Sequence, residues 1–516
     1  MATSEPNATL AGLSALKDGG NAVDAAIAAS FALAVTLPAA GNLGGGGFLL
    51  YRDAEGAAWF LDHREVAPTN AARGMYLDEK GIPIPLASRM GWKAAGVPGT
   101  VIGLAEAHRR WGSLKWKDLL APAIELAEQG FSISEREHRG IARAANYFAA
   151  DPFASEVFLT KDGKALPVGA LLRQPRLGAT LRKIAEDGEA AFREGPIVEG
   201  IVGASRLDGG ILSLKDFRDY QPVLRPVHAF AWKGLQVLAA SPPSSGGIFL
   251  EQTLTLLGDG VLQEWGPQDA KAIQLIAEVE AAAFRDRNRW LGDPAGFDFL
   301  LSDLTDSDYL FDLRGRLSPR RYTPPDVELA GSPIESEETT HLSTVDGDGG
   351  AVALTTTLNS GYGAKVMAPG GFLMNNEMDD FATNPGKANQ FGLVQGEYNE
   401  VVPGRRPLSS MSPVIVVKGE NVDAVVGSPG GPTILTTVLQ ILLNRYEFGM
   451  DARAAVEAPR FHRQDRPPTL RHESGRLRAS VRQQLRLLGQ PLESVRSLGD
   501  VNAIFRGPQG EWIPIA

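Results

Sequence analysis

The sequence contains no cysteine at all. This absence excludes disulfides, thiolate zinc sites and a cysteine nucleophile together, and it leaves the redox compartment undetermined. Basic residues are also fewer than acidic ones: 51 Lys and Arg stand against 61 Asp and Glu, which gives a formal charge of −10. No block of clustered Lys and Arg occurs, although neutralising a phosphate backbone requires one. The composition therefore argues against nucleic acid as a partner.

Long hydrophobic runs are missing as well. The longest apolar run, from Ala25 to Ala40, is shorter than a bilayer span and contains a Ser, a Thr and a Pro. We therefore expect a buried helix there and no membrane span. The first residues, Met1 to Pro6, have neither the basic segment nor the apolar core of a secretory signal. As written, the sequence predicts a cytoplasmic protein, or a periplasmic or secreted one if a leader is missing.

Several common catalytic sets are also absent. The seven His residues include no pair at i and i+4, which excludes an H-E-x-x-H zinc helix, and no Ser lies in a G-x-S-x-G elbow. Four successive glycines, Gly44 to Gly47, are followed by a strand pattern and not by a helix. They predict close backbone approach in a core, and argue against a nucleotide cradle. We expect no metal and no cofactor.

The chain is long enough, at 516 residues with 43% hydrophobic residues, for two domains or one large layered domain. Helical spacing and caps predict helices over residues 21–35, 98–111, 113–129, 134–145, 270–291 and 433–446. Strand patterns cover residues 48–52, 57–63, 235–240, 414–418 and 424–426. The polar, proline-interrupted residues 303–338 predict an exposed linker that few elements cross. Residues 382–403 predict a polar loop that is a lid or disordered.

One further β-hairpin is indicated by residues 339–345 and 351–358. Both segments are rich in β-branched residues, and the Asp-Gly-Asp-Gly-Gly between them suits a turn with positive φ. If the turn is centred on its middle residue, Thr339 faces Thr357 across the hairpin. Asn359, two residues further, shares that face. The hairpin thus places two hydroxyl groups and an amide together.

Thr339 is a candidate nucleophile, although an ordinary Thr-rich strand has the same pattern. An internal Thr hydroxyl is a poor nucleophile. A cut just before Thr339 would give this residue a free α-amine, whose ordinary pKa of about 7.7 to 8.0 allows it to act as base near pH 7 without a His. The acid-rich segment that ends at Glu338 could tolerate such a cut.

Two other segments carry groups that could bind a charged ligand. Arg64 stands at the end of a predicted strand beside Asp62 and Glu65, which on local grounds indicates a structural ion pair. The loop 427–431, Gly-Ser-Pro-Gly-Gly, directly precedes the predicted helix 433–446. Its glycines and the N–H groups of that helix start could converge on a negative charge.

Seven motifs occur in the order that they have in one known family. They are residues 19–26 (Gly-Gly-Asn-Ala-Val-Asp-Ala-Ala), 44–48 (Gly-Gly-Gly-Gly-Phe), 64–65 (Arg-Glu), 243–247 (Pro-Ser-Ser-Gly-Gly), 339–341 (Thr-Thr-His), 406–413 (Arg-Pro-Leu-Ser-Ser-Met-Ser-Pro) and 427–431 (Gly-Ser-Pro-Gly-Gly). Over nearly its whole length the chain resembles the γ-glutamyltranspeptidases (γ-glutamyltransferases) of the N-terminal nucleophile hydrolase superfamily. The resemblance implies an α+β fold, a four-layer αββα sandwich with two stacked antiparallel sheets between helical layers.

The resemblance also implies self-processing. The precursor would cleave itself at Glu338–Thr339, leaving a large subunit of residues 1–338 and a small subunit of residues 339–516. The two would stay together as a heterodimer and form one αββα domain. The mature enzyme would transfer the γ-glutamyl group of glutathione and other γ-glutamyl compounds to water, amino acids or dipeptides.

The site residues follow from the same resemblance, position by position. The matching positions imply Thr339 as nucleophile, Thr357 as its contact, and the Gly430 and Gly431 amides as oxyanion hole. Those implied to bind substrate are Arg64, Ser409 and Ser410 for the α-carboxylate, and Asn359, Glu377 and Asp380 for the amine. A lid over about residues 385–397 has Phe391 at its tip, where some bacterial members place a Tyr. Since Phe cannot hydrogen-bond to Asn359, we expect lid closure to rest on packing alone.

Two alternatives remain open at this stage. One is an acylase of the same fold with another donor, such as a cephalosporin, a glutaryl amide or poly-γ-glutamate. A glutaryl group has no amine, so Glu377 and Asp380 favour a γ-glutamyl donor. The other alternative is a binding or scaffold protein that keeps the fold without catalysis, and it predicts an uncut chain.

Overall fold

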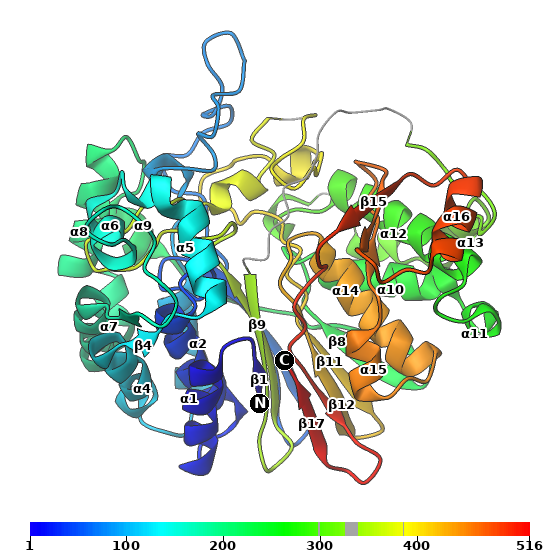
Figure 1. Cartoon of the computed structure of the whole chain (residues 1–516), viewed down its shortest axis with the longest axis horizontal. Coiled ribbons are helices and arrows are strands. Elements are labelled where there is room, and N and C mark those ends of the chain that lie inside the picture. Colours follow the sequence, from blue (N-terminus) through cyan, green and yellow to red (C-terminus); the bar gives the residue numbers. More distant parts are fainter. Residues whose placement is uncertain (298–299, 326–338, 385) are drawn as a thin grey trace.

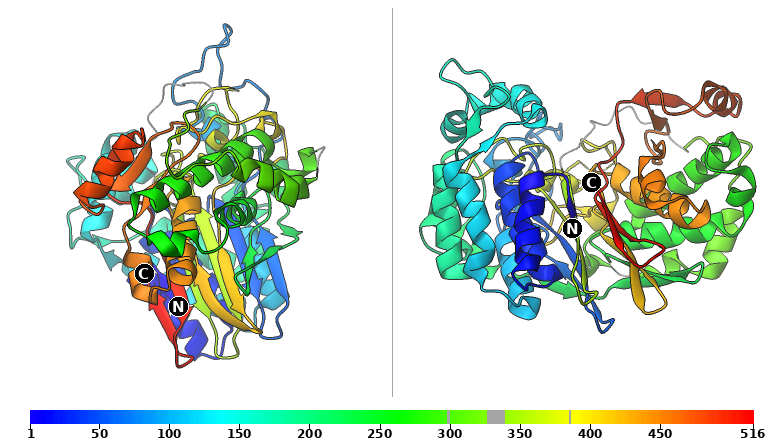
Figure 2. Two further views of the ribbon diagram at one scale, coloured as in Figure 1. Left: turned by 90° about the vertical axis from the view of Figure 1, so that its right-hand side faces the viewer. Right: turned by 60° about the horizontal axis from the view of Figure 1, so that its bottom comes forward.

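Two antiparallel sheets form the centre of the molecule, and helices cover the outer face of each (Figure 1 and Figure 2). The computed structural model describes residues 1–297, 300–325, 339–384 and 386–516. In these residues the first sheet has the strand order β1 (Ala2–Thr3), β9 (Thr339–Val345), β10 (Ala351–Thr357), β2 (Gly46–Arg52), β3 (Ala58–Asp62) and β6 (Val223–Arg225). The second has the order β17 (Trp512–Ile515), β16 (Ala503–Arg506), β12 (Asn421–Val426), β11 (Val414–Lys418), β8 (Leu235–Ala239) and β7 (His228–Trp232).

The outer layers are helical, one on each side of the sheet pair. Helices packed into the core of the first sheet are α1 (Pro6–Lys17), α2 (Ala22–Thr36), α3 (Thr100–Trp111), α4 (Trp116–Gln129), α5 (Glu135–Phe148), α6 (Pro152–Phe158), α7 (Pro175–Asp187), α8 (Pro196–Leu207) and α9 (Leu214–Asp219). Helices packed into the core of the second are α10 (Gly246–Leu257), α11 (Val261–Trp265), α12 (Ala270–Trp290), α13 (Ser307–Arg314), α14 (Thr433–Leu442), α15 (Ala452–Glu457) and α16 (Ala479–Leu487). Two small sheets complete the structure, formed by β13 (Phe461–His462), β14 (Leu470–Glu473) and β15 (Leu492–Val495), and by β4 (Phe131–Ser132) and β5 (Leu171–Leu172).

The alternation of side chains along β2 shows why the layers stack. Leu49 and Tyr51 pack into the core of the first helical layer, whereas Phe48 and Leu50 point the other way, into the core that holds the second sheet and its helices. Successive side chains of a strand point to opposite faces, so a strand that is apolar at every position must be covered on both sides. The predicted four-layer α+β sandwich is confirmed.

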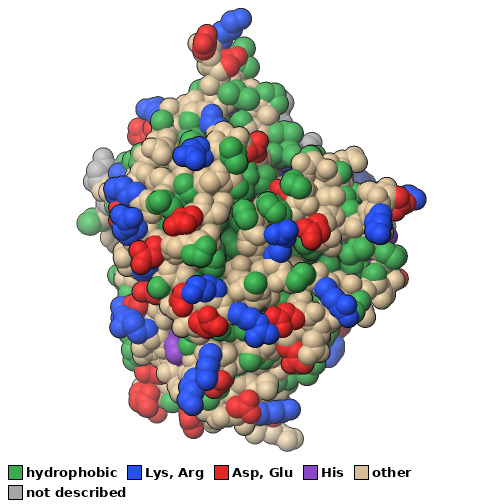
Figure 3. Space-filling model, turned by 90° about the vertical axis from the view of Figure 1, so that its left-hand side faces the viewer, with side chains coloured by type: hydrophobic (Ala, Val, Ile, Leu, Met, Phe, Trp, Pro, Cys, Tyr) green, Lys and Arg blue, Asp and Glu red, His purple; other side chains and the backbone are tan. Residues whose placement is uncertain are grey.

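Helix α2 is the central helix that its sequence predicted. All of its residues are buried, and Asn21 and Asp24 form a capping box at its start. None of the helices in the described residues combines the length and apolarity that crossing a bilayer requires. On the outer face seen in Figure 3, acidic and basic side chains are interspersed.

The β9–β10 hairpin has the predicted register, with Thr339 opposite Thr357 and Val345 opposite Ala351. It lies in the middle of the first sheet, between β1 and β2. Strands that come after residue 338 are therefore flanked on both sides by strands from the earlier part, and the second sheet also contains strands from both parts. The two parts of the chain share one fold.

The expectation of an exposed linker over residues 303–338 is wrong for its first half. Helix α13 begins after the N-cap Asp306, and its Leu310 and Leu313 are buried in the second core. Two apolar residues three positions apart were enough to anchor a helix of two turns against α10. Residues 326–338, including Glu338, lie outside the described residues.

Candidate active site

The predicted site residues converge on one small cavity at the end of the β9–β10 hairpin. The cavity has a volume of about 20 Å³, room for a single water. It is lined by Arg64, Arg287, Thr339, Thr357, Asn359, Glu377, Asp380, Phe391, Leu393, Ser409, Ser410, Met411, Gly431, Pro432 and Ile434. Of the predicted set, only Gly430 and Glu338 are missing: Gly430 precedes Gly431, and Glu338 lies outside the described residues.

Thr339 and Thr357 form the centre of the cavity. Thr339 is the first residue of β9 and is buried, with its Oγ1 3.3 Å from Thr357 Oγ1. The Asn359 N–H donates to Thr357 Oγ1 at 2.8 Å. Because this oxygen already accepts a hydrogen bond from the backbone, the arrangement favours the Thr357 hydroxyl as donor toward Thr339 Oγ1.

Two glycines between β12 and α14 provide free backbone donors beside this pair. Gly430 has φ of 133° and Gly431 φ of 57°, conformations that side chains rarely adopt. The Thr433 hydroxyl donates to the Gly430 carbonyl at 2.8 Å and fixes the turn. Neither glycine amide donates to any residue that the structure describes. Both are available to an oxyanion.

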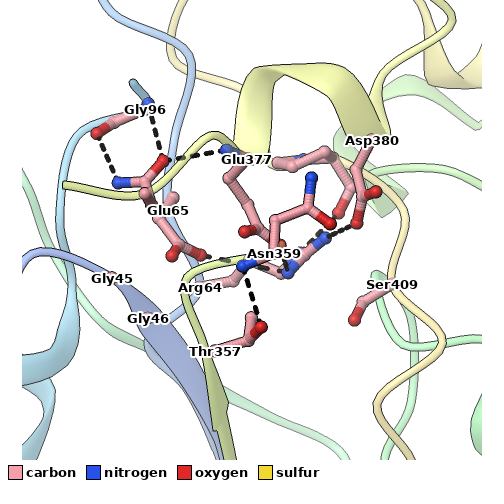
Figure 4. Close-up of polar contacts among 12 residues, drawn as sticks. Gly45, Gly46, Arg64, Glu65, Gly96, Thr357, Asn359, Glu377, Asp380 and Ser409 are labelled. Carbon is pink, nitrogen blue, oxygen red and sulfur yellow. Dashed lines mark hydrogen bonds and ion pairs between the residues drawn. The ribbon is translucent and has the colours of Figure 1, made fainter. Parts of the chain in front are cut away.

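Arg64 is held between two acids, close to Thr357 and Asn359 (Figure 4). Its Nη1 forms an ion pair with Glu377, and its Nη2 one with Asp380 Oδ2 at 2.5 Å. Its Nε donates to the Pro407 carbonyl at 2.9 Å. Arg64 does form the ion pair expected from the sequence, with Glu65 at 3.9 Å. Its direct hydrogen-bonded partners, however, are acids more than 300 positions away in the sequence.

Burial dominates the electrostatics of this cluster. It raises the pKa of Glu377 well above its usual range, raises that of Asp380, and raises that of Glu65 to about 8, although Arg64 opposes all three shifts. Burial alone would lower the pKa of Arg64, but the three carboxylates outweigh it and raise that pKa. The cluster therefore holds a fixed cation beside carboxyl groups whose pKa values burial raises.

The serine pair lies across the cavity, on the loop that enters β11. Ser409 Oγ accepts a hydrogen bond from the Met411 N–H at 3.1 Å, and Ser410 Oγ accepts one from Arg287 at 3.0 Å. Arg287 was missed by the sequence analysis. It belongs to α12, and the amphipathic pattern of that helix gives no sign that one of its arginines points inward.

Phe391, the expected tip of the lid, lines the cavity and is 5% exposed. Lid closure does not rest on packing alone, and that expectation is wrong. Gln464 Nε2 donates to the Phe391 carbonyl at 3.0 Å, the Gln390 N–H donates to Asp379 at 3.3 Å, and Arg89 Nε donates to the Gln390 side chain at 3.2 Å. Hydrogen bonds from backbone and neighbouring side chains therefore hold residues 390 and 391 in addition to packing.

None of the His, Asp and Glu side chains in the described ranges form a group of three suited to a metal ion. The acids in the cavity are instead paired with a guanidinium. What the site can do chemically is acyl transfer: it combines a hydroxyl nucleophile, free amide donors and groups of both charge signs.

Comparisons with known proteins agree with this chemistry. A family model described as Gamma-glutamyltranspeptidase matches residues 8–516. The chain is 39% identical over 514 residues to the glutathione hydrolase proenzyme of Escherichia coli strain K12, covering 99% of this chain and 88% of that protein. It is 42% identical over 496 residues to the protein of the same name from Pseudomonas aeruginosa, covering 95% and 87%.

Solved structures give the same result for the fold. Helicobacter pylori gamma-glutamyltranspeptidase is similar at a TM-score of 0.61 and 36% identity, covering 62% of this chain and 92% of that one. A cephalosporin acylase from Bacillus halodurans has a TM-score of 0.87 but only 24% identity, covering 99% and 92%, so it bears on the fold alone. On the match over residues 8–516 and the identity to full-length relatives, the chain belongs to the gamma-glutamyltranspeptidase family.

Proposed function

We propose that this protein is a self-processing γ-glutamyl acyltransferase and hydrolase that acts on glutathione and related γ-glutamyl amides. The observation that carries the proposal is the convergence of residues from distant parts of the chain around Thr339 and Thr357. One cavity is lined by the two threonine hydroxyls, by Arg64 and by the acids Glu377 and Asp380. The backbone amides of two glycines lie in or next to its lining. Identity to two named glutathione hydrolase proenzymes supports the donor.

In this proposal the precursor cleaves itself before Thr339. The Thr339 hydroxyl attacks the Glu338 carbonyl, and the Glu338–Thr339 amide bond breaks, which leaves Glu338 as an ester on the hydroxyl and frees the Thr339 α-amine. Hydrolysis of this ester then releases the Glu338 carboxylate and restores the Thr339 hydroxyl. Residues 1–338 and 339–516 then form a heterodimer, held together by sheets that contain strands from both. The solved Helicobacter pylori chain matches 62% of this chain. The proposed large subunit has a similar share, 338 of 516 residues, so the length of the match supports a division near residue 339.

Catalysis then proceeds through an acyl-enzyme on Thr339. Its Oγ1 attacks the γ-carbonyl carbon of the donor while the proton passes to the α-amine of the same residue. The Gly430 and Gly431 amides stabilise the oxyanion, an effect of roughly 3 to 4 kcal/mol per donor. The C–N bond breaks and the leaving amine takes the proton. Water or an amine acceptor next attacks the ester, releasing glutamate or a new γ-glutamyl amide.

Donor recognition exchanges one set of ion pairs for another. In the structure Arg64 forms ion pairs with Glu377 and Asp380. A γ-glutamyl group brings a carboxylate for Arg64 and the serine pair, and an ammonium for the two acids and Asn359, so no charge is buried unpaired. Because the cavity of about 20 Å³ cannot hold this group, the lid around Phe391 must move before binding.

The proposal is tested with p-nitroanilides of γ-glutamic acid and of glutaric acid, which differ only in the α-amine. The purified, processed protein should hydrolyse the γ-glutamyl compound with the higher kcat/KM, by about 100-fold or more, because two buried acids lose their partner with glutaryl. Thr339→Ala serves as the control and should be uncut and inactive. A preference for glutaryl anilide would favour an acylase with another donor.

A further inference from the structure

Arg287 is a buried cation whose side chain hydrogen-bonds to three neutral groups. The nearby charge of Asp380 also acts on it, but that carboxylate forms its ion pair with Arg64. Its side chain is 2% exposed and lines the same cavity as Thr339. Nε donates to Ser245 Oγ at 3.1 Å, Nη1 to Asn288 Oδ1 at 2.9 Å and Nη2 to Ser410 Oγ at 3.0 Å. These acceptors are neutral, and no carboxylate in the described part of the chain forms an ion pair with it. A buried charge without a direct ion-pair partner favours binding of an anion.

The other cation of the cavity is in the opposite situation. Arg64 has Glu377 and Asp380 as direct partners. Burial lowers the pKa of Arg287 to about 10, so it still carries its charge at neutral pH. An anion that enters the site therefore meets one guanidinium in direct ion pairs with two acids and one that is hydrogen-bonded to neutral groups. The second of these, Arg287, contacts the serine pair through Ser410.

The hydrogen bonds of Arg287 also orient that serine pair. A guanidinium can only donate, so Ser410 Oγ must accept, and the Ser410 hydroxyl hydrogen remains free to point into the cavity. Ser245, which accepts from Arg287 Nε, in turn donates to the Ser409 carbonyl at 2.8 Å. Arg287 thereby connects α12, the start of α10 and the serine loop, and fixes where both hydroxyl groups stand.

We propose that Arg287 is a positioning residue for the α-carboxylate of the donor. It supplies a positive charge that no carboxylate of the described residues pairs with directly, and it sets the Ser410 hydroxyl as a hydrogen-bond donor to that carboxylate, while Arg64 remains shared with the acids until the ammonium arrives. This inference rests on the proposed function, because it requires a donor with an α-carboxylate.

Three ligands separate this role from a merely structural one. L-glutamate carries both charged groups, glutarate has no amine, and 4-aminobutyrate has no α-carboxylate. Each is measured as a competitive inhibitor of γ-glutamyl anilide hydrolysis by the processed enzyme. Arg287→Gln should raise the inhibition constants of glutamate and glutarate by about 10- to 100-fold, the range for a hydrogen bond to a charged group. The constant of 4-aminobutyrate should change by less than about threefold.

Further variants locate the effect. Arg287→Lys keeps the charge and should recover part of the glutamate affinity. In a Ser410→Ala background, Arg287→Gln should have a smaller effect than in the wild type, because part of its action passes through the Ser410 hydroxyl. Arg289→Gln, two residues away on the same helix and exposed, is the matched control and should leave all three constants unchanged. For a variant too inactive to assay, the ligand-induced rise in Tm gives the same comparison.

Equal weakening of all three ligands by Arg287→Gln would overturn the proposal, as would unchanged binding of glutamate. This result differs from a failure of the proposed function itself. In that case the wild-type protein would not hydrolyse γ-glutamyl anilide at all. If it does hydrolyse it and the carboxylate selectivity does not move, only the role of Arg287 is wrong.

Discussion

At the scale of single residues, the site combines groups that are individually unfavourable. Arg64 and Glu377 are fully buried, and Glu65 is buried with neither carboxyl oxygen hydrogen-bonded to a described side chain or amide. Such groups are tolerated when charges of opposite sign lie close together and protons can be shared. A ligand that brings both signs, as an α-amino acid head does, fits this environment without adding net charge.

Glu65 gives a test of these electrostatics through stability. Burial raises its pKa in the folded protein to about 8, above the ordinary value of an unfolded chain. The folded state therefore holds the proton more tightly, and the associated stability is present below about pH 4 and lost as the pH rises to about 8. Glu65→Gln cannot lose this proton. Its free energy of unfolding relative to the parent should rise with pH, by up to about 1.4 kcal/mol per unit between pH 5 and 7.

This measurement requires a single chain, so both proteins carry Thr339→Ala, which keeps the precursor uncut. Urea unfolding is followed at several pH values, and only the pH dependence of the difference is compared. The amide introduced by Glu65→Gln is also expected to change the free energy of unfolding by an amount that does not depend on pH. Two curves that run parallel from pH 5 to 8 would mean that Glu65 is ionised throughout.

At the scale of elements, the hairpin and the glycine run before β2 act together. The Cβ of an alanine at position 45 would lie 2.1 Å from the Thr357 carbonyl oxygen, which belongs to the neighbouring strand. To relieve this contact, the backbone would have to shift β10, the strand that carries Thr357. The glycines thus serve the close backbone approach that the sequence predicted, directly beside the site.

Gly45→Ala should therefore lower both stability and activity. Overpacking of this kind costs about 1 to 3 kcal/mol, and the displaced Thr357 should reduce kcat more than it raises KM. Gly347→Ala is the matched control, because a Cβ there meets nothing within 4 Å. Thermal unfolding and anilide hydrolysis measure both effects. Equal Tm and kcat for the two variants would show that the strands are not in such close contact.

The elements that the sequence predicted well are those with a strong local pattern. The hairpin register and the strand Val414–Lys418 agree with the structure, because β-branched runs and turn residues act locally. Helix α4 begins at Trp116 and not at the predicted Ser113, because the Ser113 hydroxyl and N–H bind Asp24 of α2. Such a long-range contact leaves no local trace.

The sequence predicted only those site residues that belong to a family motif. The family motifs identified ten of the cavity-lining residues, but they could not show that Arg64 is already paired with Glu377 and Asp380. Arg287 and the Gln464 bond to the lid were missed for a physical reason. Which side of a helix or loop faces a pocket is decided by packing between distant segments, not by the residues around it in sequence.

At the scale of the whole molecule, each sheet mixes strands from before and after residue 339. In the first sheet, β9 and β10 lie between β1 and β2, and in the second, β11 and β12 lie between β8 and β16. A cut before Thr339 would therefore free a chain end at the cavity without separating the two parts, because the hydrogen-bonded ladders and both cores hold them together. The fold can be cleaved there and stay intact.

The most direct test is N-terminal sequencing of the smaller fragment after denaturing electrophoresis of the purified protein. The account predicts two bands from the 55.1 kDa chain, the smaller with 178 residues (516 less 338), roughly 19 kDa by proportion, and beginning Thr-Thr-His-Leu. The Thr339→Ala protein should run as one band. A fragment that begins at any residue other than Thr339, or an active protein that stays uncut, would contradict the account.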